Sequence, residues 1–164
     1  MQYISPFSFL PATPSSTFTR KDIVLAKRKL LAEFELLGTS TIIHNNKEIS
    51  RNDVLVFFEQ LERSNDLDFH ALVASNKELL HFLETHKLQH HFNFTLDSEK
   101  VNTEFIEWLS PYYAAAFKDC SYQYFRKLQL PEFQVLINNQ TLMTADDRYT
   151  SWQPVENYFH SLVQ

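Results

Sequence analysis

The chain has 164 residues, of which 44% are hydrophobic, 15% aromatic and 21% charged, and its 15 basic and 20 acidic residues give a net charge of −5. It contains one glycine, Gly38, where average usage would give roughly eleven. Dinucleotide fingerprints, P-loops and nucleophile elbows all need several glycines within a few residues, so the sequence excludes these sites. Scarce glycine also disfavours large sandwiches and barrels, which are rich in tight turns. We therefore expect a mainly α fold, with about six helices in one compact domain and one or two short β-hairpins.

The cysteine content and the distribution of apolar residues indicate where the chain resides. Its single cysteine, Cys120, cannot form an internal disulfide, which is typical of a reducing compartment. No apolar stretch approaches the roughly 18 residues that a membrane span requires. The first nineteen residues contain no lysine or arginine, so the cationic start of a secretory signal is missing. These features predict a cytoplasmic chain that does not cross a membrane.

Residues 1–19 are predicted to form an extended apolar arm that precedes a single helical domain over residues 20–164. The arm is uncharged and contains three of the six prolines, which favour extended backbone. Its side chains, which include Phe7 and Phe9, are too apolar for a generic disordered tail. We expect them to cover their own domain, and the alternative is that they contact the surface of a partner.

Capping residues and apolar spacing predict the elements of the first half of the chain. Thr19 with Asp22 resembles a capping box, and apolar residues at 3.6-residue spacing continue to Leu37, after which Gly38 suits a left-handed C-terminal cap. Residues 41–43 and 48–49 are predicted to pair as a short hairpin around 44–47. Ser50 with Asp53 then predicts the start of a helix that extends to about Arg63.

The second half is predicted to contain further helices with less regular boundaries. A short helical stretch is expected around 69–74, and Ser75 with Glu78 predicts a capping box for the next helix. A helix is expected from Asp97 or Ser98, and Ser110-Pro111 predicts the start of another, which should turn sharply from it and end before Pro131. Residues 133–143 fit either a hairpin or a short helix. Pro154 is expected to begin the last helix, whose apolar pattern continues to the end of the sequence, so the chain could be the N-terminal part of a longer protein.

A cluster of histidines gives the only pattern typical of a metal site. His81, His86, His90 and His91 lie within eleven residues, and His86 and His90 are four apart, which suits two imidazoles on one zinc ion. No third ligand is apparent, and Glu84 does not complete the His-Glu-x-x-His pattern. We therefore expect capping, solvated or packed histidines and no cofactor, and a metal-dependent helical enzyme using His86 and His90 is the alternative.

Cys120 is a second candidate for chemistry, as a nucleophile. It falls in line with Tyr113, Phe117 and Tyr124, at positions that share one helix face. A buried cysteine in such a stripe behaves as a small hydrophobic residue. We therefore expect Cys120 to be structural and the chain to have no catalytic residue.

Arg20–Lys29 contains five basic residues and one acidic residue, while the rest of the chain after it has ten basic and nineteen acidic residues. Such a patch could meet phosphates or an acidic partner. Lys21 and Arg28 project away from the apolar stripe of their helix, whereas Lys27 lies near it. Because the cations form no continuous stripe, nucleic-acid binding is disfavoured and remains the third hypothesis.

Aromatic residues are concentrated in the last third of the chain. Tyr112, Tyr122 and Phe125 fall away from the face that their helix buries. Aromatic side chains with a polar tip are enriched at protein interfaces. One alternative is that a further layer of the same domain covers these rings. The other alternative is that these rings contact a partner. Together with the apolar arm, it leads to our first hypothesis, a non-enzymatic helical module that binds a protein partner or a second copy of itself. The residues expected to make this contact are Phe7, Phe9, Lys21, Arg28, Tyr112, Tyr122 and Phe125.

Overall fold

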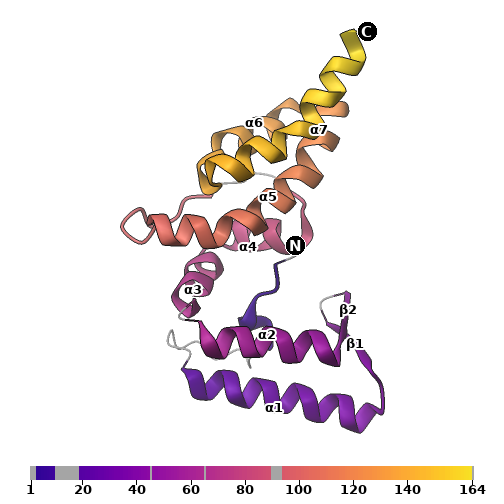
Figure 1. The fold of residues 1–164 in the computed structure, drawn as a ribbon, viewed down its shortest axis with the longest axis vertical. Coiled ribbons are helices and arrows are strands. Elements are labelled where there is room, and N and C mark those ends of the chain that lie inside the picture. Colours follow the sequence, from indigo (N-terminus) through magenta and orange to yellow (C-terminus); the bar gives the residue numbers. More distant parts are fainter. Residues whose placement is uncertain (1–2, 10–18, 45, 65, 90–93, 164) are drawn as a thin grey trace. The chain divides into compact units, whose positions relative to one another are not determined.

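The computed structural model describes residues 3–9, 19–44, 46–64, 66–89 and 94–163, and its mainly α architecture confirms the predicted fold class (Figure 1). The chain divides into two compact units, one formed by Ser5–Ala71 and the other by Met1–Ile4 with Leu72–Gln164. The described residues form seven α-helices, one hairpin and two short 3-10 helices: η1 (Pro6–Phe9), α1 (Arg20–Leu37), β1 (Thr41–His44), β2 (Lys47–Ser50), α2 (Arg51–Arg63), α3 (Leu67–Ser75), α4 (Lys77–Thr85), α5 (Thr103–Arg126), α6 (Leu130–Asn138), η2 (Gln140–Leu142) and α7 (Ala145–Val163). None of these helices combines the length and the apolar composition that crossing a bilayer requires.

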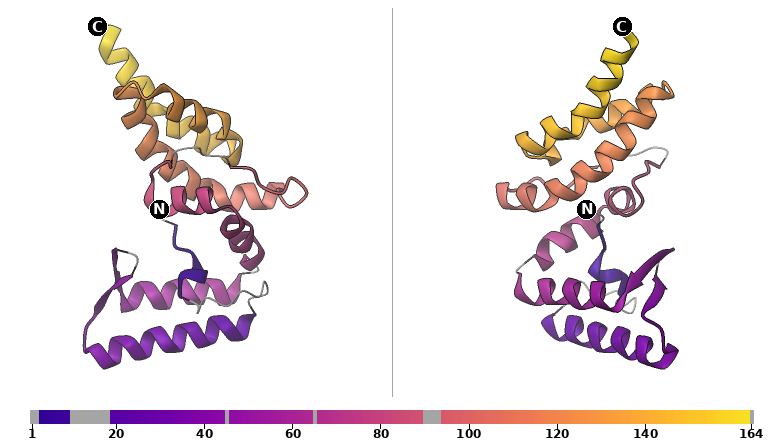
Figure 2. Two further views of the ribbon diagram at one scale, coloured as in Figure 1. Left: turned by 180° about the vertical axis from the view of Figure 1, so that it is seen from behind. Right: turned by 45° about the vertical axis from the view of Figure 1, so that its right-hand side comes forward.

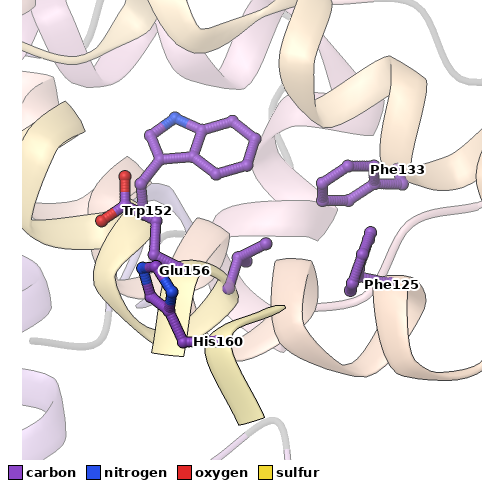
Figure 3. A pocket seen from close by; sticks show the side chains of 6 residues that line it. Phe125, Phe133, Trp152, Glu156 and His160 are labelled. Atoms are coloured by element: carbon purple, nitrogen blue, oxygen red, sulfur yellow. The ribbon is translucent and has the colours of Figure 1, made fainter. Parts of the chain in front are cut away.

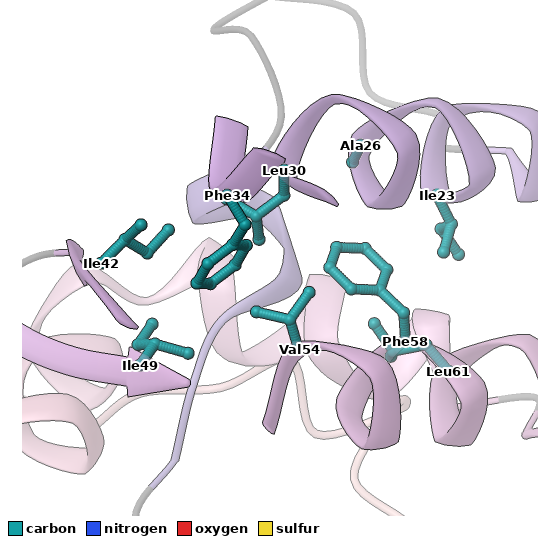
Figure 4. Close-up of a cluster of buried hydrophobic side chains, with 9 residues drawn as sticks. All are labelled: Ile23, Ala26, Leu30, Phe34, Ile42, Ile49, Val54, Phe58 and Leu61. Atoms are coloured by element: carbon teal, nitrogen blue, oxygen red, sulfur yellow. The ribbon is translucent and has the colours of Figure 1, made fainter. Parts of the chain in front are cut away.

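The core of the Ser5–Ala71 unit forms where α1, α2 and the hairpin meet (Figure 4). β1 and β2 are antiparallel, and Ile42 opposite Ile49 places two buried side chains on one face of the hairpin. The helices add buried side chains at three- and four-residue spacing, which places them on one face of each helix. The cluster comprises Ile23, Ala26, Leu30, Phe34, Ile42, Ile49, Val54, Phe58 and Leu61.

The boundaries of α1 and α2 follow the predicted caps. The Thr19 N–H donates to the Asp22 carboxylate over 2.7 Å, and α1 ends at Gly38, which adopts the left-handed conformation with φ 62°. The capping box of α2 uses Ser50 and Asp53, where the Asp53 N–H donates to Ser50 Oγ over 3.1 Å and Asp53 accepts from the Ser50 N–H. The single glycine thus lies at a helix end, where the backbone conformation would strain any side chain.

The second unit is built around α5, which packs against α4, α6 and α7. Figures 1 and 2 show α6 and α7 beside the C-terminal part of α5. Fully buried side chains of α5 recur every four residues, at Phe105, Leu109, Tyr113 and Phe117. This stripe makes α5 the element against which the other helices of the unit bury their apolar faces.

The predicted helix boundary at Ser110-Pro111 is wrong, because α5 runs without interruption through Pro111. Proline inside a helix removes one backbone hydrogen bond and costs about 3 kcal/mol. Here the buried stripe continues on both sides of the proline. In addition, Ser110 Oγ accepts from the Thr144 N–H over 2.8 Å and donates to Asp147 Oδ2 over 2.5 Å. Ser110 therefore does not cap its own helix but caps the first turn of α7.

Two further predicted helix starts lie at the wrong residue. Asn76, not Ser75, caps α4, and the Ser75 hydroxyl donates instead to the Leu72 carbonyl within α3. Asn102, not Asp97 or Ser98, caps α5, because residues 98–100 form a turn. In both cases an asparagine side chain accepts from the third residue of the helix, a role in which Asn, Asp and Ser are interchangeable from sequence alone.

The last third of the chain differs from the sequence-based expectation at two prolines, and it decides between the two alternatives for residues 133–143. Leu128 adopts φ 55° after α5 has ended, so Pro131 does not stop α5 but lies in the first turn of α6, where its missing N–H costs nothing. Of the two alternatives for residues 133–143, the short helix is confirmed, because they form most of α6 followed by η2 and no hairpin. α7 begins at Ala145, and Pro154 lies inside it rather than at its start.

The predicted extended arm is partly helical. Pro6–Phe9 forms the 3-10 helix η1, closed by a hydrogen bond from the Ser8 N–H to the Ser5 carbonyl. Residues 3–5, which precede it, belong to no helix or strand. Residues 10–18 lie outside the described residues.

Replacing Ser110 by alanine tests the cap that joins α5 to α7. Ser110→Ala leaves the Thr144 N–H and the Asp147 carboxylate without this partner, and we expect the free energy of unfolding to fall by about 1–3 kcal/mol. Urea denaturation monitored by circular dichroism measures this change. Ser161→Ala is the matched control, since its exposed hydroxyl bonds only within α7. Equal stability of the two variants would contradict the role assigned to Ser110.

Candidate functional site

His86, the described member of the predicted metal pair, caps the end of α4. It adopts a left-handed conformation with φ 55°, and its N–H donates to the Phe82 carbonyl over 2.8 Å. Its ring Nδ1 lies 2.6 Å from Asp119 Oδ2 on α5. His90 and His91 lie outside the described residues, and within the described ranges no three histidine, cysteine or acidic residues gather as a metal site would require. His86 therefore occupies the capping role that the sequence favoured.

Cys120 and Tyr124 of α5 bond to the backbone of the residues that directly follow α4. The buried Cys120 thiol donates to the His86 carbonyl, and the Tyr124 hydroxyl accepts from the Leu88 N–H over 3.1 Å. Burial, followed by the negative charge of Asp119, raises the pKa of the Cys120 thiol to about 12. A thiol with this pKa is protonated at neutral pH, so it does not act as a nucleophile there. Its burial supports the structural role expected for Cys120.

The apolar side chains of the N-terminal segment contact their own units. Phe9 stacks on His44 with ring centroids 4.2 Å apart and also contacts Phe57 and Phe58. Phe7, in η1, is half-buried. In the other unit, Tyr3 is buried and its ring makes an edge contact with Tyr112, 5.4 Å between centroids. These contacts favour the first expectation, in which the segment covers its own chain.

The C-terminal aromatic residues are partly covered by α6 and α7. Tyr122 makes an edge contact with Tyr158 of α7, and Phe125 contacts both Tyr158 and Phe133. All four rings are half-buried. A further helical layer of the same unit therefore accounts for a part of their surface, while Phe125 also lines a hollow between α5, α6 and α7.

Six exposed residues on α1 form the surface that we call the outer α1 face. Successive residues of an α-helix turn by about 100°, so the six side chains fall within an arc of about 100° on the side opposite the buried residues. This arc contains no carboxylate. The outer α1 face consists of Lys21, Leu25, Arg28, Lys29, Ala32 and Leu36, all of them exposed.

The outer α1 face combines exposed leucines with cations that α2 does not neutralise. Leu25 is 61% exposed and Leu36 88% exposed, so the two leucines place apolar surface among the cations of this face. Lys27, in contrast, points toward α2, where its Nζ lies 3.2 Å from Glu62 Oε1. An open hollow of about 370 Å³ at the start of the face is lined by Arg20, Lys21, Val24 and Leu25. The chemistry of this surface suits an apolar ligand that carries negative charge.

A second surface feature lies in the other unit, where α5, α6 and α7 meet. We call it the aromatic hollow; it has a volume of about 400 Å³ and is lined by Phe125, Phe133, Trp152, Val155, Glu156 and His160. The Phe133 ring makes an edge contact with Trp152, 5.7 Å between centroids, and Phe125 contacts Phe133 at 5.4 Å. Figure 3 shows Trp152, Glu156 and His160 along α7 on one side and the two phenylalanine rings on the other.

Sequence reasoning identifies one residue of the aromatic hollow, Phe125, and misses its two ionisable groups. Trp152, Glu156 and His160 follow one another at four-residue spacing, which places them on one face of a helix. A helix that begins at Pro154, as the sequence predicts, excludes Trp152 and so breaks this pattern. Because Pro154 is the tenth residue of α7 and not its first, the four-residue spacing of these side chains is not recognised from the sequence alone.

Comparisons with known proteins find no match for this chain. No protein-family model matches the chain. Comparison with the curated proteins gives no match, and comparison with the solved structures gives none either. Function is therefore inferred from the two surfaces themselves.

Two substitutions of His86 separate the effect of its left-handed backbone conformation from the effect of its contact with Asp119. We expect His86→Ala to lower the free energy of unfolding more than His86→Gly, by about 1 kcal/mol, because both lose the contact with Asp119 but only glycine adopts φ 55° without strain. Chemical denaturation of both variants measures the difference. If alanine were the more stable replacement, the left-handed cap would not contribute as described.

The reactivity of Cys120 tests its burial, since no other thiol in the chain can react. At pH 8.5 the folded protein should react with iodoacetamide about two to three orders of magnitude more slowly than the protein in 8 M urea, because the thiolate is scarce when the pKa is about 12. Between pH 9 and pH 12 the unfolded thiol ionises while the folded one stays protonated, so we expect stability to fall as the pH rises. Equal labelling rates in the two states would contradict the assignment.

Proposed function

We propose that this chain is a non-enzymatic helical interaction module that binds an acidic, amphipathic helix of a protein partner on the outer α1 face. The observation that carries the proposal is the presence of exposed leucines within an arc of cations that contains no carboxylate. A cytoplasmic location is part of the proposal, because the one cysteine stays a thiol and fits a reducing compartment.

The spacing along the outer α1 face is that of a short coiled-coil seam. Leu25, Lys29, Ala32 and Leu36 follow one another at intervals of four, three and four residues, which is the repeat of core positions between two packed helices. Lys21 and Arg28 flank the first part of this seam at the positions that select the charge of a partner helix, and Glu33 and Glu35 flank its end. The seam is confined to α1, which ends at Gly38, so it offers about two heptads.

The charge of the outer α1 face specifies a partner helix of opposite charge. A lysine at a core position is tolerated when the facing helix supplies a carboxylate, and it disfavours a partner with an apolar residue there. Flanking cations attract glutamates and repel lysines, which sets partner choice more than total affinity. We therefore expect leucines along the seam of the partner and glutamates opposite Lys21, Arg28 and Lys29.

The leucines favour a protein helix over phosphate ligands. Phosphate contacts use cations and polar groups, so exposed leucines in the centre of the face would add little to nucleic-acid binding. Helices that bind a membrane surface present a broader apolar face to the lipid. The outer α1 face has two leucines and one alanine between its cations, which fits a narrow helix–helix seam better.

A designed peptide tests the chemistry of the partner. The probe is a 21-residue helical peptide with leucine at the core positions and glutamate at the flanking positions, and its control peptide has lysine in place of every glutamate. We expect the protein to bind the glutamate peptide and not the lysine peptide, and the Lys21→Glu/Arg28→Glu variant to weaken binding of the glutamate peptide about tenfold or more. Titration calorimetry at low salt measures both affinities.

Two matched variants assign the binding to the outer α1 face. Arg51→Glu/Arg63→Glu makes the same change in net charge on α2 and should leave the affinity within about twofold. Leu25→Ala should weaken binding about tenfold or more, because it removes an apolar contact that the partner would bury. Equal affinity for the two peptides, or tighter binding of duplex DNA or phosphatidylserine vesicles by the same face, would overturn the proposal. Self-association that Lys21→Glu/Arg28→Glu abolishes would overturn it too, since a second copy would then be the occupant.

A further inference from the structure

We infer that the aromatic hollow is a second binding site, which takes an arginine side chain presented by a peptide segment of a partner protein. The inference is independent of the outer α1 face, since the hollow belongs to the other unit and has the opposite charge. Three features of the hollow support it: the ring surfaces, the carboxylate beside them and the volume that they enclose.

The walls of the hollow are suited to a flat cation. Phe125 and Phe133 line one side of the hollow and Trp152 the other. Phe133 and Trp152 touch edge to face, but all three rings are half-buried, so each retains exposed surface on which a cation could stack. Aromatic faces attract cations, tryptophan most strongly, and the guanidinium group of arginine also stacks on them. A neutral apolar side chain would use the rings but not the charge beside them.

Glu156 supplies the only charge of fixed sign among the described residues that line the hollow. It lies one helical turn after Trp152, so its carboxylate and the indole flank the same side of the hollow (Figure 3). No lysine or arginine is among these described lining residues, and the one other ionisable group that lines the hollow is His160, one turn further along α7. A guanidinium group can form paired hydrogen bonds with a carboxylate and can also stack on aromatic rings, so it suits this combination of groups.

The size of the hollow suits a single side chain. A volume of about 400 Å³ is at the lower end for small-ligand pockets. An arginine side chain is of a size that this open hollow can hold. The aliphatic stem of arginine would lie on the rings and the guanidinium group at Glu156.

Short peptides that differ in one side chain test the inference directly. The probe is acetyl-Gly-Ser-Arg-Ser-Gly-amide. It is compared with a peptide carrying lysine at the central position and with one carrying citrulline, which keeps the shape of arginine but not the charge. Binding is followed by the NMR signal of the Trp152 indole N–H, identified with the Trp108→Phe variant. We expect the arginine peptide to shift this signal and to bind about threefold to tenfold more tightly than the citrulline peptide.

Variants distinguish the carboxylate from a general effect of net charge. Glu156→Gln should reduce the affinity for the arginine peptide to that for the citrulline peptide. Glu107→Gln, which removes an exposed carboxylate elsewhere on α5, should leave the preference for arginine unchanged. The inference is overturned if the arginine and citrulline peptides bind alike, if Glu156→Gln keeps the preference, if the lysine peptide binds as tightly as the arginine peptide, or if millimolar peptide does not shift the Trp152 signal. None of these outcomes depends on the outer α1 face, so the two proposals can fail separately.

Discussion

Burial of one face of α1 against α2 and the hairpin underlies the proposed function. Once Ile23, Leu30 and Phe34 enter the core, the 3.6-residue repeat fixes the direction of every other side chain of α1. The outer α1 face is therefore as well defined as the core, although none of its residues packs there. Lys27 lies between the buried face and the outer α1 face. Its ammonium group pairs with the Glu62 carboxylate on α2, so its charge is already compensated within the chain.

The two candidate binding surfaces have complementary chemistry. The outer α1 face presents cations around exposed leucines, and the aromatic hollow presents a carboxylate beside aromatic rings. Each surface belongs to its own unit and is built on rigid helices, which position side chains more accurately than loops do. A module with one surface for an acidic partner and one arginine site would bind two partners, or two segments of one partner.

The groups that suggest chemistry in the sequence have structural roles in the described chain. His86 and Cys120, together with Tyr124, meet at residues 86–88 after α4, where the imidazole contacts Asp119 and the hydroxyl and thiol satisfy backbone groups. Buried backbone groups without partners are costly, so this use of polar side chains stabilises a turn that has no glycine. In a sequence with one glycine, left-handed positions fall on other residues, and His86 and Leu128 are two of them. The position of His86 is therefore in part a consequence of the same scarcity that favours a helical fold.

Local sequence is sufficient to predict the fold class, the caps of α1 and α2, the hairpin and the outward direction of Lys21 and Arg28. These features depend on neighbours within about four residues, so spacing and side-chain type specify them. The course of α5 through Pro111, the start of α7 ahead of Pro154 and the assembly of the aromatic hollow depend instead on packing between distant segments. There, contacts between residues far apart in the chain outweigh local preferences: Ser110 caps α7 instead of its own helix, and Phe125, Phe133 and Trp152 meet only because α5, α6 and α7 pack together.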